Sequence, residues 1–256
     1  MTHISLRNGH SCAFCNPLRA RPSWLYEQIV GIEVVGPLGL LARRADRLAA
    51  LVDRLAGDGI PAEEFLADLN TPGEAAAAIA AIRDRLGRID VVEYGPISGE
   101  QGFIPAARLD SAELQALIPL LLLSPVEIMQ AVLPEWRGRG DGAFLLTQGA
   151  SAVQGIPHLS GVGPVMAAAR NYVYSLYGEL AAQGIYAGTL SVAGLITGSE
   201  IAEATVGAVP DSGAAFPSVN PDDLAQAYWE LYTRRDRAER IYPEPMRKPR
   251  PTDPGR

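Results

Sequence analysis

Residues 142–197 read GAFLLTQGASAVQGIPHLSGVGPVMAAARNYVYSLYGELAAQGIYAGTLSVAGLIT. The segment opens with an apolar run at 143–146 that ends in small polar residues. An alanine-rich amphipathic stretch follows at about 164–183, and a second apolar run at 186–192 ends in a glycine turn and a threonine. This order predicts a strand, a helix and a strand, with the functional edge at the carboxyl ends of the two strands.

The same alternation runs through the chain before this segment. A short apolar run ends at Arg43 and Arg44, and apolar side chains then recur at the helical spacing i, i+3, i+4 and i+7. These apolar residues are Leu48, Leu51, Val52 and Leu55. Predicted strands at 64–69 and 91–94 enclose a predicted helix at 73–86. Because strands alternate with helices, the sheet is predicted to be parallel.

Between and after these units the chain adds two helices and a closing strand. Residues 112–136 predict a long helix, in which Pro119 and Pro125 should introduce a kink or a division. Asn-Pro-Asp-Asp at 220–223 opens a last helix with acidic residues at its positive end, and 239–242 predicts a strand.

The fold class predicted from these elements is α/β, with a Rossmann-like, doubly wound parallel sheet flanked by helices. One domain is expected at 40–242. Residues 1–39 form an atypical N-terminal segment, in which the first strand and helix are degraded or remodelled. Residues 243–256 are rich in proline and arginine and predict a flexible tail.

Composition narrows the class of partner. The chain has 256 residues, 48% of them hydrophobic, and a net charge of −7. No basic stripe is present, so we expect no nucleic-acid partner. The longest apolar run, at 114–126, is interrupted by Gln115 and two prolines, so we expect no membrane span. Without a signal-peptide pattern and with only two cysteines, a reduced cytoplasmic location is expected.

The N-terminal segment contains two further patterns. His3, His10, Cys12 and Cys15 have a spacing that a tetrahedral zinc site tolerates, but a single CxxC pair equally fits two ordinary thiols or a redox pair, and we expect no metal. A dinucleotide-binding first strand should end in a glycine-rich turn. No such motif stands here, although Gly36-Pro37-Leu38-Gly39 is a candidate for a degraded turn.

Taken together, 40–242 resembles the short-chain dehydrogenase/reductase family. The segments that carry the resemblance are LLARRADRLAAL, FLADLNTP, GRIDVV, AVLPEW and LYGELAAQGIYAGTLSVAGLIT. The resemblance implies an NAD(P)-dependent oxidoreductase acting on a carbonyl or alcohol substrate. It also implies a homodimer or homotetramer formed through the fourth and fifth helices.

The resemblance places the cofactor along one edge of the sheet. Arg43 and Arg44 stand where an acidic ribose ligand is otherwise expected, and two arginines there can hold the 2′-phosphate of NADP, so NADP is favoured over NAD. The alternative is a solvated helix start. Asp68 and Leu69 would lie beside the adenine. The other implied cofactor contacts are Gly95, Pro96, Gly194, Ile196 and Thr197.

The side chains that carry the family's chemistry are missing from their expected positions. By register, the tyrosine position falls on Val162, the lysine position on Met166, the serine position on Gly149 and the asparagine position on Leu121. None of these can perform acid–base work. We therefore expect altered or lost catalysis, and the alternative is a non-catalytic binding or scaffold protein, a pseudoenzyme, that keeps the fold.

Other residues are candidate substitutes for the missing groups. Ser151, His158 and Ser160 lie in the loop that should border the nicotinamide pocket, and His158 has a suitable pKa range for acid–base work. Tyr94, beside Glu93 at the end of a predicted strand, is a candidate for the missing phenol. The competing interpretations are a structural histidine and a tyrosine that packs beneath the loop.

Overall fold

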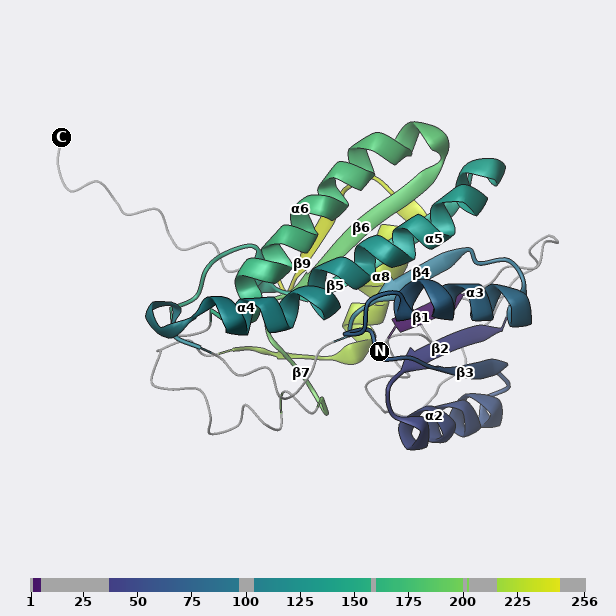
Figure 1. Cartoon of the computed structure of the whole chain (residues 1–256), viewed down its shortest axis with the longest axis horizontal. Helices are drawn as coiled ribbons and strands as arrows, with labels where there is room; N and C mark the ends of the chain where they lie inside the picture. The colour runs from purple at the N-terminus through teal and green to yellow at the C-terminus, as the bar shows by residue number, and fades with distance from the viewer. Residues whose placement is uncertain are drawn as a thin grey trace.

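The computed structural model describes residues 2–5, 37–96, 104–157, 160–199, 202 and 216–244, with the backbone alone for 2–5. A seven-stranded sheet forms the centre of this part, in the order β3-β2-β1-β4-β5-β6-β9 (Figure 1). Its strands are β1 Thr2–Ser5, β2 Leu38–Ala42, β3 Ala62–Leu66, β4 Val91–Tyr94, β5 Gly142–Gly149, β6 Ile185–Val192 and β9 Glu239–Tyr242. Two short strands, β7 Leu195–Ile196 and β8 Ser218–Val219, pair separately.

Helices cover both faces of the sheet. One face carries α3 Glu74–Leu86, α5 Ser124–Arg139 and α6 Val162–Leu180, and the other carries α2 Ala45–Gly57 and α8 Pro221–Arg234 (Figure 1). The shorter helical segments are η1 Ala106–Arg108, α4 Ser111–Ile118, the π-helix η2 Pro119–Leu123, η3 Ala150–Ala152 and η4 Ala181–Gln183. The two helical layers give the predicted α/β, Rossmann-like arrangement.

The strand directions confirm most of the predicted topology. The pairs β2–β3, β4–β5, β5–β6 and β6–β9 are all parallel. Parallel strands need a crossover, and the helices between them supply it. Their carboxyl ends therefore meet at one edge, which we call the carboxyl edge.

Strand β1 departs from this pattern. It lies between β2 and β4 and is antiparallel to both. Thr2 stands opposite Leu41 and Tyr94, whereas Ser5 stands opposite Leu38 and Val91. Strand β1 therefore begins at the carboxyl edge and ends at the opposite edge.

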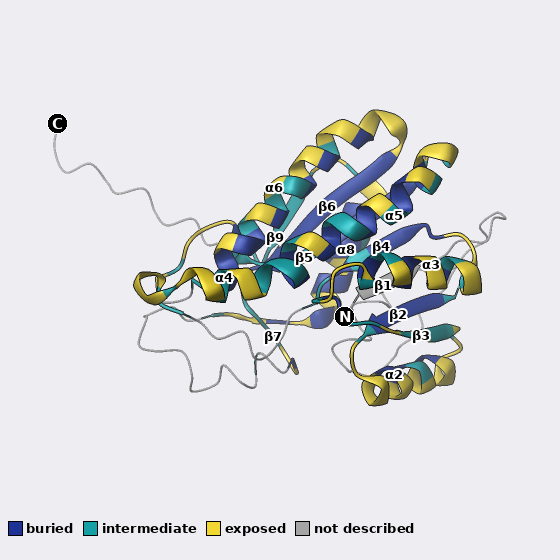
Figure 2. Cartoon of the chain, viewed as in Figure 1, coloured by how far each residue is buried: buried dark blue, intermediate teal, exposed yellow. Residues whose placement is uncertain are grey.

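The larger core lies between the sheet and the layer of α3, α5 and α6 (Figure 2). Trp136 of α5 is fully buried, and its Nε1 donates a hydrogen bond of 2.9 Å to the Ile89 carbonyl oxygen. The indole lies against Gly142, where a Cβ would overlap its ring. The glycine at the start of β5 thus makes room for the largest side chain of the core.

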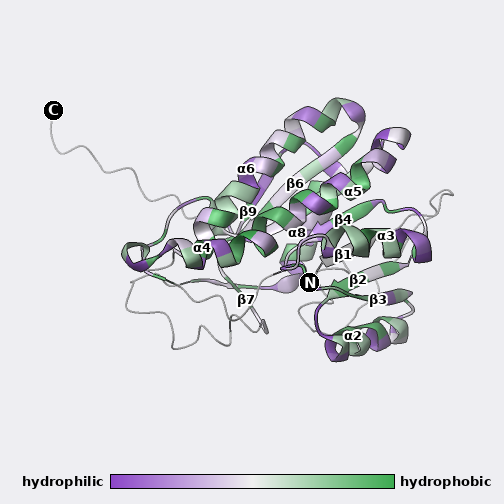
Figure 3. Cartoon of the chain, viewed as in Figure 1, coloured by the Kyte–Doolittle hydropathy of each residue, from purple (hydrophilic) through white to green (hydrophobic). Residues whose placement is uncertain are grey.

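The opposite face has two smaller cores. Leu48, Leu51 and Leu55 of α2 are buried, as their spacing predicted. Helix α8 buries Tyr228 and its apolar neighbours against β5 and β6. Figure 3 shows hydrophobic residues along the strands and more hydrophilic residues on the outer sides of the helices.

The long predicted helix is divided at Pro119. Helix α4 ends there, η2 makes a π-turn, and α5 continues with Pro125 in its first turn. The span Ser111–Arg139 is long and apolar enough to cross a membrane by length and composition alone. Because 44% of its most apolar window is buried in the structure, these properties equally fit a core helix.

Gly184 connects η4 to β6 in a conformation that other residues rarely adopt. Its φ is 75°, and a Cβ would overlap the backbone carbonyl oxygen of Gly140. We expect Gly184→Ala to lower the free energy of unfolding by about 2–3 kcal/mol, from left-handed strain and the clash. Urea denaturation measures this loss.

The matched control is Gly178→Ala. Gly178 is exposed in the last turn of α6, which continues into η4, and a Cβ added there would have no other atom within 4 Å. Alanine there should raise the stability by about 0.5–1 kcal/mol, because glycine costs backbone entropy in a helix. Equal effects at the two sites would contradict the conformational argument.

Candidate functional site

Residues predicted to bind the cofactor lie along the carboxyl edge, as the fold requires. Arg43 follows β2 and Asp68 follows β3. Gly95 follows β4, Gly149 ends β5, and Gly194 follows β6. The predicted positions therefore share one edge.

Arg43 and Asp68 face each other across β2 and β3. Nε of Arg43 lies 4.0 Å from Oδ1 of Asp68, and about half of each side chain is exposed. Asp68 Oδ1 also accepts hydrogen bonds from Nδ2 and the backbone N–H of Asn70, at 2.9 and 3.1 Å. Burial alone would raise the pKa of Asp68, but the bonds from Asn70 and the charge of Arg43 lower it. An exposed arginine is thus held beside an ionised carboxylate.

The residues on either side of this pair are part of the local framework. Arg44 is the N-cap residue of α2, and its side chain is exposed. Leu69 is buried, and its carbonyl oxygen accepts a hydrogen bond of 2.6 Å from Ser124 Oγ. Leu69 therefore anchors the end of β3 to α5.

The segment after β6 is fixed by its own backbone. The hydroxyl and the backbone N–H of Thr197 both donate to the Val219 carbonyl oxygen, at 3.2 and 3.0 Å. Ile196 pairs with Val219 in the β7–β8 ladder. A Cβ at Gly194 would overlap the Pro217 carbonyl oxygen, so the close approach of the two chain segments requires glycine.

Three polar side chains meet on the face of the sheet that α8 covers. The hydroxyl of Thr147 (β5) donates to Oε1 of Glu93 (β4) and is hydrogen-bonded to the hydroxyl of Tyr228 (α8). Tyr228 lies 3.5 Å from the same Glu93 oxygen. We call Glu93, Thr147 and Tyr228 the hydroxyl–carboxyl cluster. Burial raises the pKa of Glu93 to about 7, although both hydroxyl groups favour its ionised form.

Gly95 lies directly beside this cluster. A Cβ at this position would lie 2.8 Å from Glu93 Oε1 and 2.9 Å from Thr147 Oγ1. Any larger residue would therefore displace the cluster. Glu93, Thr147, Gly95 and Pro96 are all half-buried, whereas Tyr228 is 1% exposed.

Tyr94 points to the opposite face, because successive side chains alternate in a strand. It is 1% exposed, and its hydroxyl donates 2.5 Å to the Leu120 carbonyl oxygen. Its ring stacks on Phe144 with centroids 6.5 Å apart. Burial raises the pKa of its phenol. This placement favours the packing interpretation over the replacement of a catalytic phenol.

The four positions that the family register assigns to acid–base groups are occupied by apolar residues or glycine. Val162 and Met166 lie in the first turns of α6, at 8% and 4% exposed. Leu121 is buried in η2, and Gly149 ends β5. No hydroxyl, amine or carboxyl group is supplied by these four residues.

The loop candidates have separate positions. Ser151 is half-buried in η3, where a Cβ at Gly163 would lie 3.2 Å from its carbonyl oxygen. The backbone N–H of Ser160 donates to the Ile104 carbonyl oxygen at 2.8 Å. His158 lies outside the described residues, so its predicted role stays a prediction.

The four N-terminal residues whose spacing a zinc site tolerates lie mostly outside the described residues. His10, Cys12 and Cys15 lie outside the described residues, and His3 is described by its backbone alone. Among the residues that the structure describes, no group of three or more His, Cys, Asp or Glu side chains could hold a metal ion.

The family of the chain is shown by a match to a protein-family model. The family model described as short chain dehydrogenase matches residues 36–205. This range covers about two thirds of the chain and contains β2 to β7. The chain belongs to the short-chain dehydrogenase family. No curated protein matches it.

Solved structures share this short-chain dehydrogenase fold. A gluconate 5-dehydrogenase from Burkholderia cenocepacia, in complex with NADP and tartrate, has a TM-score of 0.72 at 19% identity, over 86% of this chain and 89% of that one. A short-chain dehydrogenase from Sphingobium yanoikuyae, in complex with NADPH, has a TM-score of 0.64 at 24% identity, over 81% and 78%. L-sorbose reductase from Gluconobacter frateurii, complexed with NADPH and L-sorbose, has a TM-score of 0.63 at 21% identity, over 77% and 80%.

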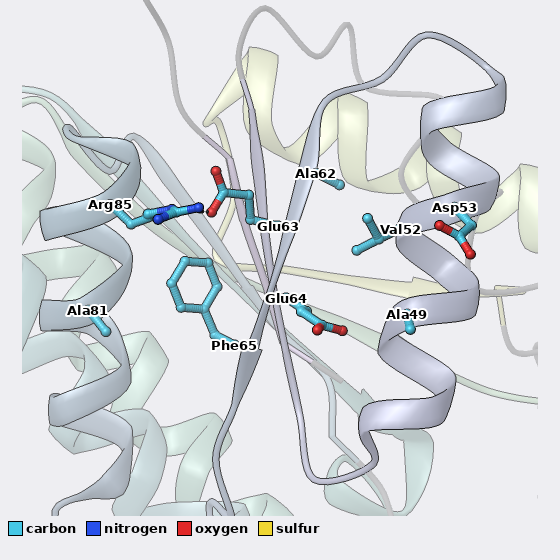
Figure 4. A pocket seen from close by; sticks show the side chains of 9 residues that line it. All are labelled: Ala49, Val52, Asp53, Ala62, Glu63, Glu64, Phe65, Ala81 and Arg85. Atoms are coloured by element: carbon cyan, nitrogen blue, oxygen red, sulfur yellow. Dashed lines mark hydrogen bonds and ion pairs between the residues drawn. The ribbon is translucent and has the colours of Figure 1, made fainter.

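A cavity of about 750 Å³ lies elsewhere, beside the outer strand β3 (Figure 4). It is lined from α2, β3 and α3, and Arg85 on its wall pairs with Glu63 at 2.6 Å. Ala62 on the same wall stands opposite Leu38, the first residue of β2. The cavity therefore lies toward the amino ends of the strands and away from the carboxyl edge.

Two members of the hydroxyl–carboxyl cluster, Thr147 and Tyr228, could not be recognised from local sequence. Glu93 was noted at the end of its strand, but Thr147 and Tyr228 were not linked to it. The available signal was a carboxylate in the otherwise apolar strand VVEY, which needs buried partners. Those partners stand 54 and 135 residues away in sequence, so only the fold brings them together.

Proposed function

We propose that this chain is an NADP-type oxidoreductase of the short-chain class, for a carbonyl or alcohol substrate, with altered or lost catalysis. The observation that carries the proposal is the exposed Arg43 guanidinium held by Asp68 at the ends of β2 and β3. A guanidinium at this place offers charge-assisted hydrogen bonds to a ribose 2′-phosphate. NADP or NADPH in the three related structures supports the choice of cofactor.

The described residues fit the adenosine end of this cofactor. Arg43 and Arg44 would face the 2′-phosphate, and Asp68 and Leu69 would lie beside the adenine. The same residues do not fit the pyrophosphate, because β1 begins at the carboxyl edge and no turn leaves it there. NADPH supplies a hydride when it is bound.

Altered catalysis follows from the positions of Gly149, Val162 and Met166. A positioned proton donor contributes roughly 10²–10⁴-fold to a rate. Without one at these positions, the family's usual mechanism lacks its acid. A non-catalytic protein that binds a nucleotide is the second candidate, and the same three residues favour it.

Nucleotide binding is tested by calorimetry with NADPH, NADH and adenosine 2′,5′-bisphosphate. We expect NADPH and the bisphosphate to bind more tightly than NADH. Arg43→Ala should lower the affinity for the two ligands that carry a 2′-phosphate, NADPH and the bisphosphate, by about tenfold or more. The reason is that a hydrogen bond to a charged group contributes about 1.5–3 kcal/mol. NADH binding should change little.

The control for charge is Arg85→Ala, which removes an exposed arginine that lies beside the cavity at β3. It should leave nucleotide affinity unchanged. Equal affinity for NADH and NADPH, or no heat with any nucleotide at millimolar concentration, would overturn the proposed cofactor. Oxidation of NADPH with a panel of ketones and aldehydes then separates an active enzyme from a binding protein.

A further inference from the structure

The hydroxyl–carboxyl cluster joins three elements that are far apart in the chain. Glu93 comes from β4, Thr147 from β5 and Tyr228 from α8. Both hydroxyl groups approach the same carboxyl oxygen, Glu93 Oε1. Burying an unpaired polar group is costly, so three that meet at one atom form a built site rather than scattered surface polarity.

The surroundings of Glu93 favour its neutral form. Among the described residues, the groups that face it are the hydroxyls of Thr147 and Tyr228, which favour the carboxylate, so burial is the cause that raises its pKa. In the described part of the chain, no arginine or lysine side chain forms an ion pair with Glu93. A carboxyl group removed from water without such a partner retains its proton more strongly.

Glu239 provides the contrast within the same sheet. Its side chain is 8% exposed, and Oε2 lies 2.6 Å from Nη2 of Arg170. Ser191 also donates to it, at 2.7 Å. Burial alone would raise the pKa of Glu239, but the bonds from Arg170 and Ser191 lower it. The pKa values of these two carboxyl groups of one fold are therefore shifted in opposite directions.

The cluster lies near the carboxyl ends of β4 and β5. The backbone of Gly95 also lies close to Glu93 Oε1, since a Cβ there would lie 2.8 Å from that oxygen. Glu93 and Thr147 are half-buried, while Tyr228 closes the cluster from the α8 side. Glu93 and Thr147 are thus the members of the cluster with surface exposed to solvent, whereas Tyr228 has almost none.

We propose that Glu93 is an acid–base group of this protein, which gives its proton to a small molecule at the carboxyl edge. Thr147 and Tyr228 are positioning residues that fix the carboxyl group and stabilise the carboxylate left behind. This inference goes beyond the proposed function and does not depend on nucleotide binding.

The proton balance is simple. The O–H bond of the Glu93 carboxyl breaks, and a new bond forms between that proton and an oxygen or nitrogen atom of the small molecule. The electron pair stays on Glu93 as a carboxylate, which accepts the hydrogen bond from Thr147. Water at the edge returns the proton.

Dicyclohexylcarbodiimide is the probe, because its nitrogen takes a proton from a neutral carboxyl group. The carboxylate then adds to the probe's central carbon, and the adduct rearranges to a stable N-acylurea without a leaving group. The full-length protein is treated without nucleotide between pH 5.5 and 8.5, and labelled residues are found by peptide mass spectrometry.

We expect the labelling rate of Glu93 to fall about tenfold between pH 6 and pH 8, as its neutral fraction falls around a pKa of about 7. Glu239 should remain unlabelled over this range. Thr147→Val and Tyr228→Phe each remove a hydroxyl that favours the carboxylate, so labelling should persist to higher pH. A residue with only a structural role would not show this shift.

Glu93→Gln serves as the specificity control and should abolish the adduct while the circular dichroism spectrum stays unchanged. The proposal is overturned if wild-type Glu93 is not labelled, if its labelling is independent of pH, or if Glu239 reacts equally fast. None of these outcomes depends on whether NADPH binds.

Discussion

Replacing Trp136 by alanine should lower the free energy of unfolding by about 4 kcal/mol, near the upper end for single core substitutions. The indole is fully buried between α5 and the sheet. Its removal leaves a cavity beside Gly142, which has no side chain to fill it. Guanidinium denaturation, followed by far-ultraviolet circular dichroism, measures the midpoint and slope.

Trp136→Phe is the matched control. It retains one six-membered aromatic ring and removes part of the indole volume together with the hydrogen bond to the Ile89 carbonyl oxygen. That oxygen also accepts a bond of 2.6 Å from Arg139 Nη2, so it does not lose its last partner. We expect a loss of about 1–2 kcal/mol. Equal losses for alanine and phenylalanine would show that the ring volume does not stabilise the core.

Local patterns in the sequence were enough to predict most elements of the sheet. Apolar runs bounded by turn residues predicted β4 at 91–94 and β9 at 239–242, and the structure confirms both ranges. The strand–helix–strand segment at 142–197 is confirmed as β5, α6 and β6. Periodicity predicts these elements because burial of one helix stripe and of continuous strand runs determines them locally.

The N-terminal segment shows where such patterns stop. No periodicity in residues 1–39 indicated that Thr2–Ser5 would pair in the centre of the sheet. Its antiparallel direction depends on β2 and β4, which come later in the chain. A four-residue strand carries too little local information to specify its partners or its direction.

Some residues of the candidate site could likewise be placed from sequence, and others could not. The predicted Arg43 and Asp68 do approach each other, because adjacent parallel strands end together. Tyr94 and Glu93 could not be assigned to their faces from sequence, since that choice depends on which helix layer covers each side. Once α5 covers Tyr94 and α8 covers Glu93, the first becomes a packing residue and the second meets Thr147 and Tyr228.

Glu93 should also make the stability of the protein fall as the pH rises from about 4.5 to 7. Burial raises the pKa of Glu93 from 4.5 to about 7 in the folded protein, so in this range the folded state binds more protons than the unfolded state. The stabilising contribution is complete below pH 4.5 and is lost as the pH rises through 7. A shift of this size corresponds to on the order of 3 kcal/mol.

The comparison of wild type with Glu93→Gln isolates this contribution. Carboxylates with lowered pKa values, such as Glu239 and Asp68, act in the opposite direction and at lower pH. They are common to both proteins and cancel in the difference. Because glutamine cannot ionise, the variant should gain about 3 kcal/mol relative to wild type between pH 5 and pH 8. Urea unfolding at several pH values gives this difference curve directly. A flat curve would mean that Glu93 titrates alike in the folded and unfolded chains, and that burial does not raise its pKa in the folded protein.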